Sequence, residues 1–176
     1  MNTSLAELEQ RAGNASAAEA AYRTALELAP DAYTTLACVD FLLDQQRPAD
    51  ALTLLRGQAR SDAVLLRLAI AGTRAGAASS PADVAEMRER IALANARPDA
   101  RVFHGREQAM FALAIDGDAA RAWSLARGNV VHQREPLDVL VMARAARAQR
   151  DPAALQEVRR VAGEIGLRDR RIEALL

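Results

Sequence analysis

Five segments of the chain share one layout, in which a short polar or Pro/Gly turn is followed by an alanine-rich amphipathic stretch. They begin near Asn14, Arg47, Pro81, Asp118 and Asp151, so the intervals between them are 33, 34, 37 and 33 residues. A repeat of this length predicts one supersecondary unit per repeat, because each unit must bury its apolar face against the next.

Five further helical stretches alternate with these segments, over residues 5–12, 31–45, 62–75, 99–116 and 137–149. In the first of the five segments, Ala18, Tyr22 and Ala25 follow the spacing i, i+4, i+7, which is one face of an α-helix. Aromatic residues make up only 3% of the chain, and alanine and leucine favour helix over strand. The sequence therefore predicts an all-α protein of about ten helices, followed by a closing stretch at 167–176.

The first repeat resembles the tetratricopeptide repeat (TPR) family, which repeats about 34 residues as a helix-turn-helix with small residues at set positions and a terminal proline. The positions that carry the resemblance are Leu5, Gly13, Ala18, Tyr22, Ala25 and Pro30. The resemblance implies a right-handed α-solenoid of about five TPR-like repeats in a single domain over residues 1–176. The repeats would span residues 1–30, 31–61, 62–98, 99–136 and 137–166, with a capping helix at 167–176.

A narrower similarity covers residues 104–111, the turn at 117–118 and residues 129–138. These stretches are similar to the C-terminal repeats of bacterial TPR proteins, which usually carry further repeats upstream. The similarity implies that the chain is the trailing part of a longer solenoid, and it implies no activity.

The two ends of the array are expected to differ. The closing stretch can lay Ile172, Leu175 and Leu176 over the last repeat, which supplies the apolar-inside cap that an array end requires. At the other end, Leu5 and Leu8 could pack inward, or an upstream repeat or a second copy of the chain could cover them.

The polar stretch at residues 132–138 (HQREPLD) has two interpretations. It could cap a helix through Arg134 and Glu135, or it could contact a partner. We favour capping.

Charge and composition exclude several classes of function. The chain has 23 basic and 23 acidic residues, so it lacks the net positive charge of a duplex nucleic-acid binder. All the basic residues are arginines, which removes lysine nucleophiles, and Cys38 is the only cysteine. No apolar run approaches the ~20 residues that span a bilayer, and no signal peptide is apparent. We expect a soluble protein of the bacterial cytoplasm or periplasm, since a mature exported chain would look the same.

The resemblance to TPR proteins also implies a binding face, because the first helix of each TPR repeat lines a concave groove. The residues that it places there and that we select as partner contacts are Glu7, Tyr33, Asp40, Arg67, Arg74, His104, Glu107, Arg144 and Arg147. The four arginines would engage carboxylates of a peptide or helix. The alternative is that they are ordinary solvated surface charges. The lysine-containing clamp with which TPR proteins hold a C-terminal carboxylate has no counterpart here.

The leading hypothesis is therefore a protein-interaction module that is not an enzyme and that has no cofactor or metal. A second hypothesis is a structural segment of a larger assembly that uses its ends or convex face. A third is an enzyme that uses His104 and Glu107, whose i, i+3 spacing could ligate a metal or relay a proton. Cys38 lies in a stretch that is apolar on two sides, so we expect it to be a packing residue.

Overall fold

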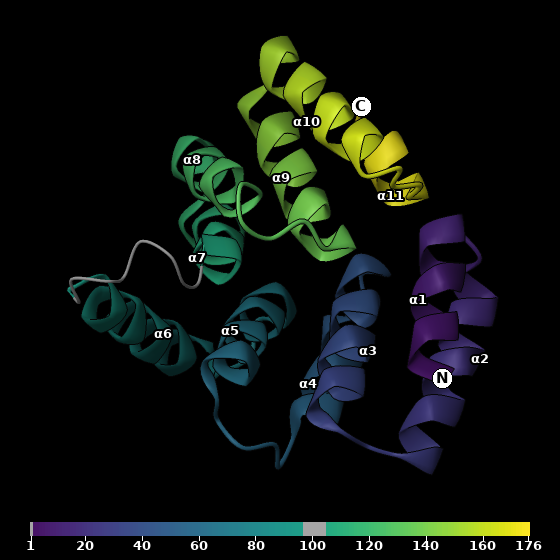
Figure 1. The fold of residues 1–176 in the computed structure, drawn as a ribbon. Helices are drawn as coiled ribbons and strands as arrows, with labels where there is room; N and C mark the ends of the chain where they lie inside the picture. Colours follow the sequence, from purple (N-terminus) through teal and green to yellow (C-terminus); the bar gives the residue numbers. More distant parts are fainter. Residues whose placement is uncertain (1, 97–104) are drawn as a thin grey trace. The chain divides into compact units, whose positions relative to one another are not determined.

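The computed structural model describes residues 2–96 and 105–176, which form helices and turns without a strand (Figure 1). The helices are α1 (Asn2–Ala12), α2 (Ala15–Leu28), α3 (Ala32–Asp44), α4 (Pro48–Leu55), α5 (Asp62–Ala75), α6 (Ser80–Asn95), α7 (Gly105–Phe111), the π-helix η2 (Ala112–Asp116), α8 (Ala119–Asn129), α9 (Pro136–Gln149), α10 (Pro152–Glu164) and α11 (Arg170–Glu173). The prediction of an all-α protein is confirmed, and its helices pack in neighbouring pairs. No helix within the described residues has the length and apolar character that crossing a membrane requires.

The helices begin where the sequence supplies caps. The Asp31 carboxylate accepts a hydrogen bond from the Thr34 backbone N–H at the start of α3, and Ser61 and Asp118 cap α5 and α8 in the same way. Helices α4, α9 and α10 start with a proline in the first turn, where its missing N–H costs nothing.

The chain divides into two compact units, Met1–Arg90 (unit 1) and Ile91–Leu176 (unit 2), with the boundary inside α6. In unit 1, α1 packs on α2 and α3 packs on α4. In addition, α1 contacts α3 and α3 contacts α5, so the first helices of successive pairs lie side by side. The core between the pairs includes Tyr22 and Phe41, whose ring centroids are 5.4 Å apart.

In unit 2, α9 is the central helix. It contacts α7, α8, α10 and α11, and most of its residues from 138 to 146 are buried. Its apolar side chains meet Ala126 and Val130 on one side and Val158 and Val161 on another. A helix that is apolar on several sides is typical of the interior of a helical stack.

Each helix pair turns through one residue with a left-handed backbone. These residues are Gly13, Gln46, Gly76, Gly117 and Arg150, with φ of 84°, 58°, 65°, 66° and 57°. Glycine adopts this conformation without a steric cost, whereas other residues lose about 1–2 kcal/mol. Gln46 and Arg150 therefore hold strained positions that glycine occupies in the other three turns.

The two ends of the chain differ, as expected. Ile172 is buried, and Leu175 and Leu176 pack against the core of unit 2, so the predicted packing of these three residues is confirmed. The inward packing considered for Leu5 and Leu8 is wrong, because their exposed fractions are 49% and 53%. The buried face of α1 carries Ala6 and Gln10 instead.

Candidate functional site

Side chains of α1 and α3 meet on the face that the first helices share in unit 1. The Tyr33 hydroxyl donates a hydrogen bond to Glu7 Oε1 at 2.5 Å, and the Oγ1 atoms of Thr3 and Thr34 lie 2.7 Å apart. Tyr33 nevertheless exposes 64% of its surface. The structure therefore brings together two of the predicted contacts, Glu7 and Tyr33, on an accessible surface.

Asp40 and Arg67 lie on the adjacent helices α3 and α5 and form a bidentate ion pair. Arg67 Nε donates to Asp40 Oδ1 at 3.0 Å, and Nη2 donates to Oδ2 at 2.6 Å. The Arg67 Nη1 group also donates to the Ala63 carbonyl at 3.3 Å. Because the Arg67 side chain is only 5% exposed, the surface position predicted for it needs correction: its guanidinium joins two helices of the stack.

Arg74 occupies the last turn of α5, and its side chain is exposed. Its Nη1 group donates to the Leu43 carbonyl of α3 at 3.2 Å. Arg74 thus bridges the same two helices as Arg67, and its positive charge lies at a carbonyl in the last turn of α3, where the helix dipole favours a cation.

The remaining predicted residues belong to the sequence of unit 2. His104 lies outside the described residues, so its pairing with Glu107 stays a prediction. The Glu107 carboxylate accepts a hydrogen bond from Arg106 Nε at 3.2 Å. On α9, Arg144 is half-buried and Arg147 is exposed.

Arg106 is the centre of a partly buried charge network that joins α7 to α9. Its Nη1 group lies 3.1 Å from Glu135 Oε2 and 3.3 Å from Asp138 Oδ1. Burial lowers the pKa of Arg106, but the charges of Glu107 and Asp138, together with the hydrogen bonds to Glu107 and Glu135, raise the pKa above the usual value. Burial raises the pKa of the Asp138 carboxyl, against the opposing effect of Arg106. This network holds helices together and leaves no open position for a ligand on Asp138, whose side chain is fully buried.

Capping by residues 132–138 is confirmed. Glu135 and Asp138 form a capping box at the start of α9, in which the Glu135 N–H donates to Asp138 Oδ2 at 2.9 Å. Arg134 Nε donates to the Val130 carbonyl at the end of α8 at 2.9 Å. Polar side chains of this stretch thus form hydrogen bonds at the ends of α8 and α9 within the chain.

Cys38 is buried, and burial raises the pKa of its thiol to about 11. A thiol that stays protonated is a poor nucleophile, so packing is its role here. Within residues 2–96 and 105–176, no three histidine, cysteine, aspartate or glutamate side chains converge in a group that could hold a metal ion.

Sequence reasoning missed a set of ion pairs whose partners are 27 to 30 residues apart in the chain. Four of these pairs join successive predicted repeats: Asp40–Arg67, Glu19–Arg47, Arg127–Glu157 and Arg134–Glu164. Two others lie within one predicted repeat: Asp62–Arg90 and Arg106–Glu135. The sequence signal that could have found them is a pair of opposite charges at this spacing.

Comparisons of the chain with protein-family models, with curated proteins and with solved structures gave no match.

Proposed function

We propose that the chain is a TPR-like helical-repeat scaffold that binds a peptide or a helix of a partner protein on the face of its first helices. The observation that carries the proposal is the side-by-side arrangement of α1, α3 and α5 with an exposed aromatic residue, Tyr33, on the α1–α3 face. Tyrosine supplies a large contact area with little loss of side-chain entropy, which makes it a frequent anchor in protein interfaces.

Two further features support a right-handed solenoid of about five repeats as the framework. The helices pack in neighbouring pairs, and each pair turns through one left-handed residue. Ion pairs such as Glu19–Arg47, Asp40–Arg67 and Arg127–Glu157 join successive predicted repeats. A stack of this kind presents an extended surface to a partner.

The contacts within the chain divide the predicted binding residues by role. Asp40 and Arg67 stabilise the stack, because their charged groups are bonded to each other below the surface. The residues that we propose for the partner are Glu7, Tyr33 and Arg74 in unit 1, and Arg144 and Arg147 in unit 2. Catalysis by His104 and Glu107 gains no support, since the Glu107 carboxylate is engaged by Arg106.

The test compares two substitutions of exposed apolar residues in unit 1. Tyr33 lies on a first helix, and Leu28, which is 72% exposed, lies on the second helix α2. Wild type, Tyr33→Ser and Leu28→Ser are immobilised and exposed to an extract of the source cells, and bound proteins are identified by mass spectrometry. We expect a protein that wild type and Leu28→Ser retain and that Tyr33→Ser loses, while all three keep the same circular dichroism spectrum. Equal retention by Tyr33→Ser, or equal loss by Leu28→Ser, rejects the first-helix face as the binding surface.

The second candidate function is a structural segment that assembles through its N-terminal end. It is favoured by the exposure of Leu5 and Leu8 on α1, which leaves an apolar strip on the first helix pair. Sedimentation equilibrium should then show association of the wild-type chain and a monomer for Leu5→Gln/Leu8→Gln. A monomeric wild type would leave the scaffold proposal as the better account.

A further inference from the structure

The charges of the two units differ in sign. Unit 1 contains 9 arginines and 12 acidic residues, and unit 2 contains 14 arginines and 11 acidic residues. Their formal charges are therefore −3 and +3, although the whole chain is neutral. An acidic partner is attracted to unit 2 and repelled by unit 1.

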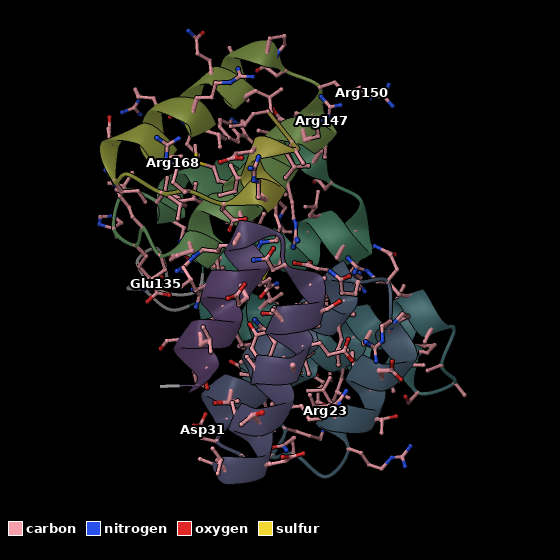
Figure 2. The ribbon with its side chains drawn as sticks, turned by 90° about the vertical axis from the view of Figure 1, so that its right-hand side faces the viewer. Arg23, Asp31, Glu135, Arg147, Arg150 and Arg168 are labelled. Atoms are coloured by element: carbon pink, nitrogen blue, oxygen red, sulfur yellow. The ribbon has the colours of Figure 1, made fainter. Side chains whose placement is uncertain are left out.

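Within residues 105–176, most arginines of unit 2 contact a carboxylate or a carbonyl oxygen, and the exceptions are Arg147 and Arg150 at the end of α9 and Arg168 before α11. Arg106, Arg127, Arg134 and Arg171 pair with carboxylates. The guanidinium groups of Arg147 and Arg150 form no hydrogen bond or ion pair within the part of the chain that the structure describes. Both are exposed and project from the same edge of unit 2 (Figure 2).

The neighbouring carboxylate, that of Asp151, forms no ion pair with Arg147 or Arg150 within the described residues. Asp151 caps α10 by accepting a hydrogen bond from the Ala153 N–H at 2.9 Å. The Gln149 side chain donates to the Ala119 carbonyl of α8 and so fixes the turn against its neighbour. The two arginines therefore form an edge of net positive charge, which we define as the α9 edge (Arg147 and Arg150), on a backbone that is held in place.

The backbone at Arg150 indicates that the side chain has a use. Its φ of 57° is left-handed, in a turn position where three of the five helix pairs have glycine. An arginine here accepts backbone strain that glycine would remove. The charge of Arg147 is explained by its favourable interaction with the C-terminal end of the α9 dipole. The backbone conformation of Arg150, in contrast, gives the chain no stability.

We propose that the α9 edge binds an acidic segment of a partner protein, through ion pairs of Arg147 and Arg150 with its carboxylates. This inference rests on the proposed function and deepens it by naming the chemistry of the partner. A protein segment fits better than a nucleic acid, because the chain has no net positive charge and neither α9 nor α10 contains an aromatic residue on which bases could stack.

The probe is a fluorescein-labelled decaglutamate peptide, titrated with the full chain at low ionic strength and followed by fluorescence anisotropy. The test variant is Arg147→Gln/Arg150→Gly. The charge-matched control, Arg23→Gln/Arg168→Gln, removes two exposed arginines outside the α9 edge: Arg23 belongs to unit 1, and Arg168 lies apart from Arg147 and Arg150 within unit 2 (Figure 2). Gln46→Gly is a second control, because it relieves the same left-handed strain in unit 1 without changing charge.

We expect the test variant to raise the Kd for decaglutamate about tenfold, since each exposed ion pair contributes roughly a factor of 2–5. Both controls should keep the wild-type Kd, and Arg150→Gly alone should raise the melting temperature while it weakens binding. A residue with a purely structural role would not show this opposite response.

Three outcomes overturn the proposal: no binding of decaglutamate to the wild-type chain, equal weakening in the charge-matched control, or tighter binding of a decathymidine oligonucleotide through the same two arginines. The capture experiment compares variants that all keep Arg147 and Arg150, so its result is read independently of the decaglutamate titration. If capture succeeds and decaglutamate fails, only the acidic partner is rejected; if both fail, the proposed function is rejected as well.

Discussion

The ion pair between Asp40 and Arg67 provides the sharpest test of how the helix pairs of unit 1 are joined. Asp40→Ala removes the bidentate carboxylate and leaves the guanidinium of Arg67 in a site where its side chain is only 5% exposed. Removing one partner of a buried pair costs about 3–5 kcal/mol, and we expect the lower end, about 3 kcal/mol, because solvent reaches part of Asp40. With a urea m-value of about 2 kcal/mol/M, this loss lowers the midpoint of unfolding by about 1.5 M.

The assay is urea unfolding followed by circular dichroism, with two controls. Asp50→Ala removes an exposed partner of Arg47, and it should cost less than about 1 kcal/mol. Asp40→Leu/Arg67→Met replaces both charges by apolar groups and should come within about 1 kcal/mol of wild type. The reasoning is refuted if Asp40→Ala costs no more than Asp50→Ala, since the pair would then behave as a solvated surface contact.

Three further predictions follow from single residues. Gln46→Gly should stabilise the chain by about 0.5–1 kcal/mol in thermal unfolding. It relieves the left-handed backbone strain of Gln46 (about 1–2 kcal/mol), and this gain exceeds the cost of the greater entropy of glycine in the unfolded chain (about 0.5–1 kcal/mol). A lower melting temperature would contradict this prediction. Cys38 should react with Ellman's reagent at pH 8 about two orders of magnitude more slowly than an ordinary thiol, since its pKa of about 11 suppresses the thiolate, and denaturant should restore the rate. The hydrogen bond from the Thr34 N–H lowers the pKa of the Asp31 carboxyl in the folded chain. The ionised carboxylate therefore adds stability at any pH above its unfolded pKa of about 3.9. This stability is lost as the pH falls through the folded pKa. The drop in melting temperature from neutral pH to about pH 3 should therefore be smaller for Asp31→Asn than for wild type, and an equal drop would show that the cap is not charged.

The helices were predictable because their signals are local. The stretch at 62–75 ends at Gly76, and α5 has the same bounds; the caps Asp31 and Ser61 likewise follow from residue type and position. Capping by residues 132–138 was favoured through Arg134 and Glu135, and the structure adds Asp138, which that interpretation did not name, as the partner of Glu135 in a capping box. Periodicity over one helix is sufficient for these conclusions.

The roles of the charged residues required contacts between helices. Helical spacing placed Arg67 on the same face as Arg74, but it could not show that Asp40, 27 residues earlier, would bind Arg67 and bury it. The sequence also could not decide whether Leu5 and Leu8 are exposed. Ala6 and Gln10 can be recognised as the buried face of α1 only from the packing of α2 and α3 against it. A search for opposite charges 27 to 30 residues apart, somewhat less than the repeat interval of 33 to 37 residues, would have found Asp40–Arg67.

The central claim is that the first helices of successive pairs lie side by side and form one face, and a disulfide between α1 and α3 tests it most directly. The Oγ1 atoms of Thr3 and Thr34 lie 2.7 Å apart, so cysteine sulfurs at these positions come within reach of a bond of about 2.05 Å. In a Cys38→Ala background, mild oxidation of dilute Thr3→Cys/Thr34→Cys should give an intramolecular disulfide, seen as a loss of two hydrogens by mass spectrometry. Thr3→Cys/Thr53→Cys, whose second cysteine lies on α4, should remain reduced. Equal oxidation of the two variants, or none in either, would contradict the arrangement on which the proposed binding face depends.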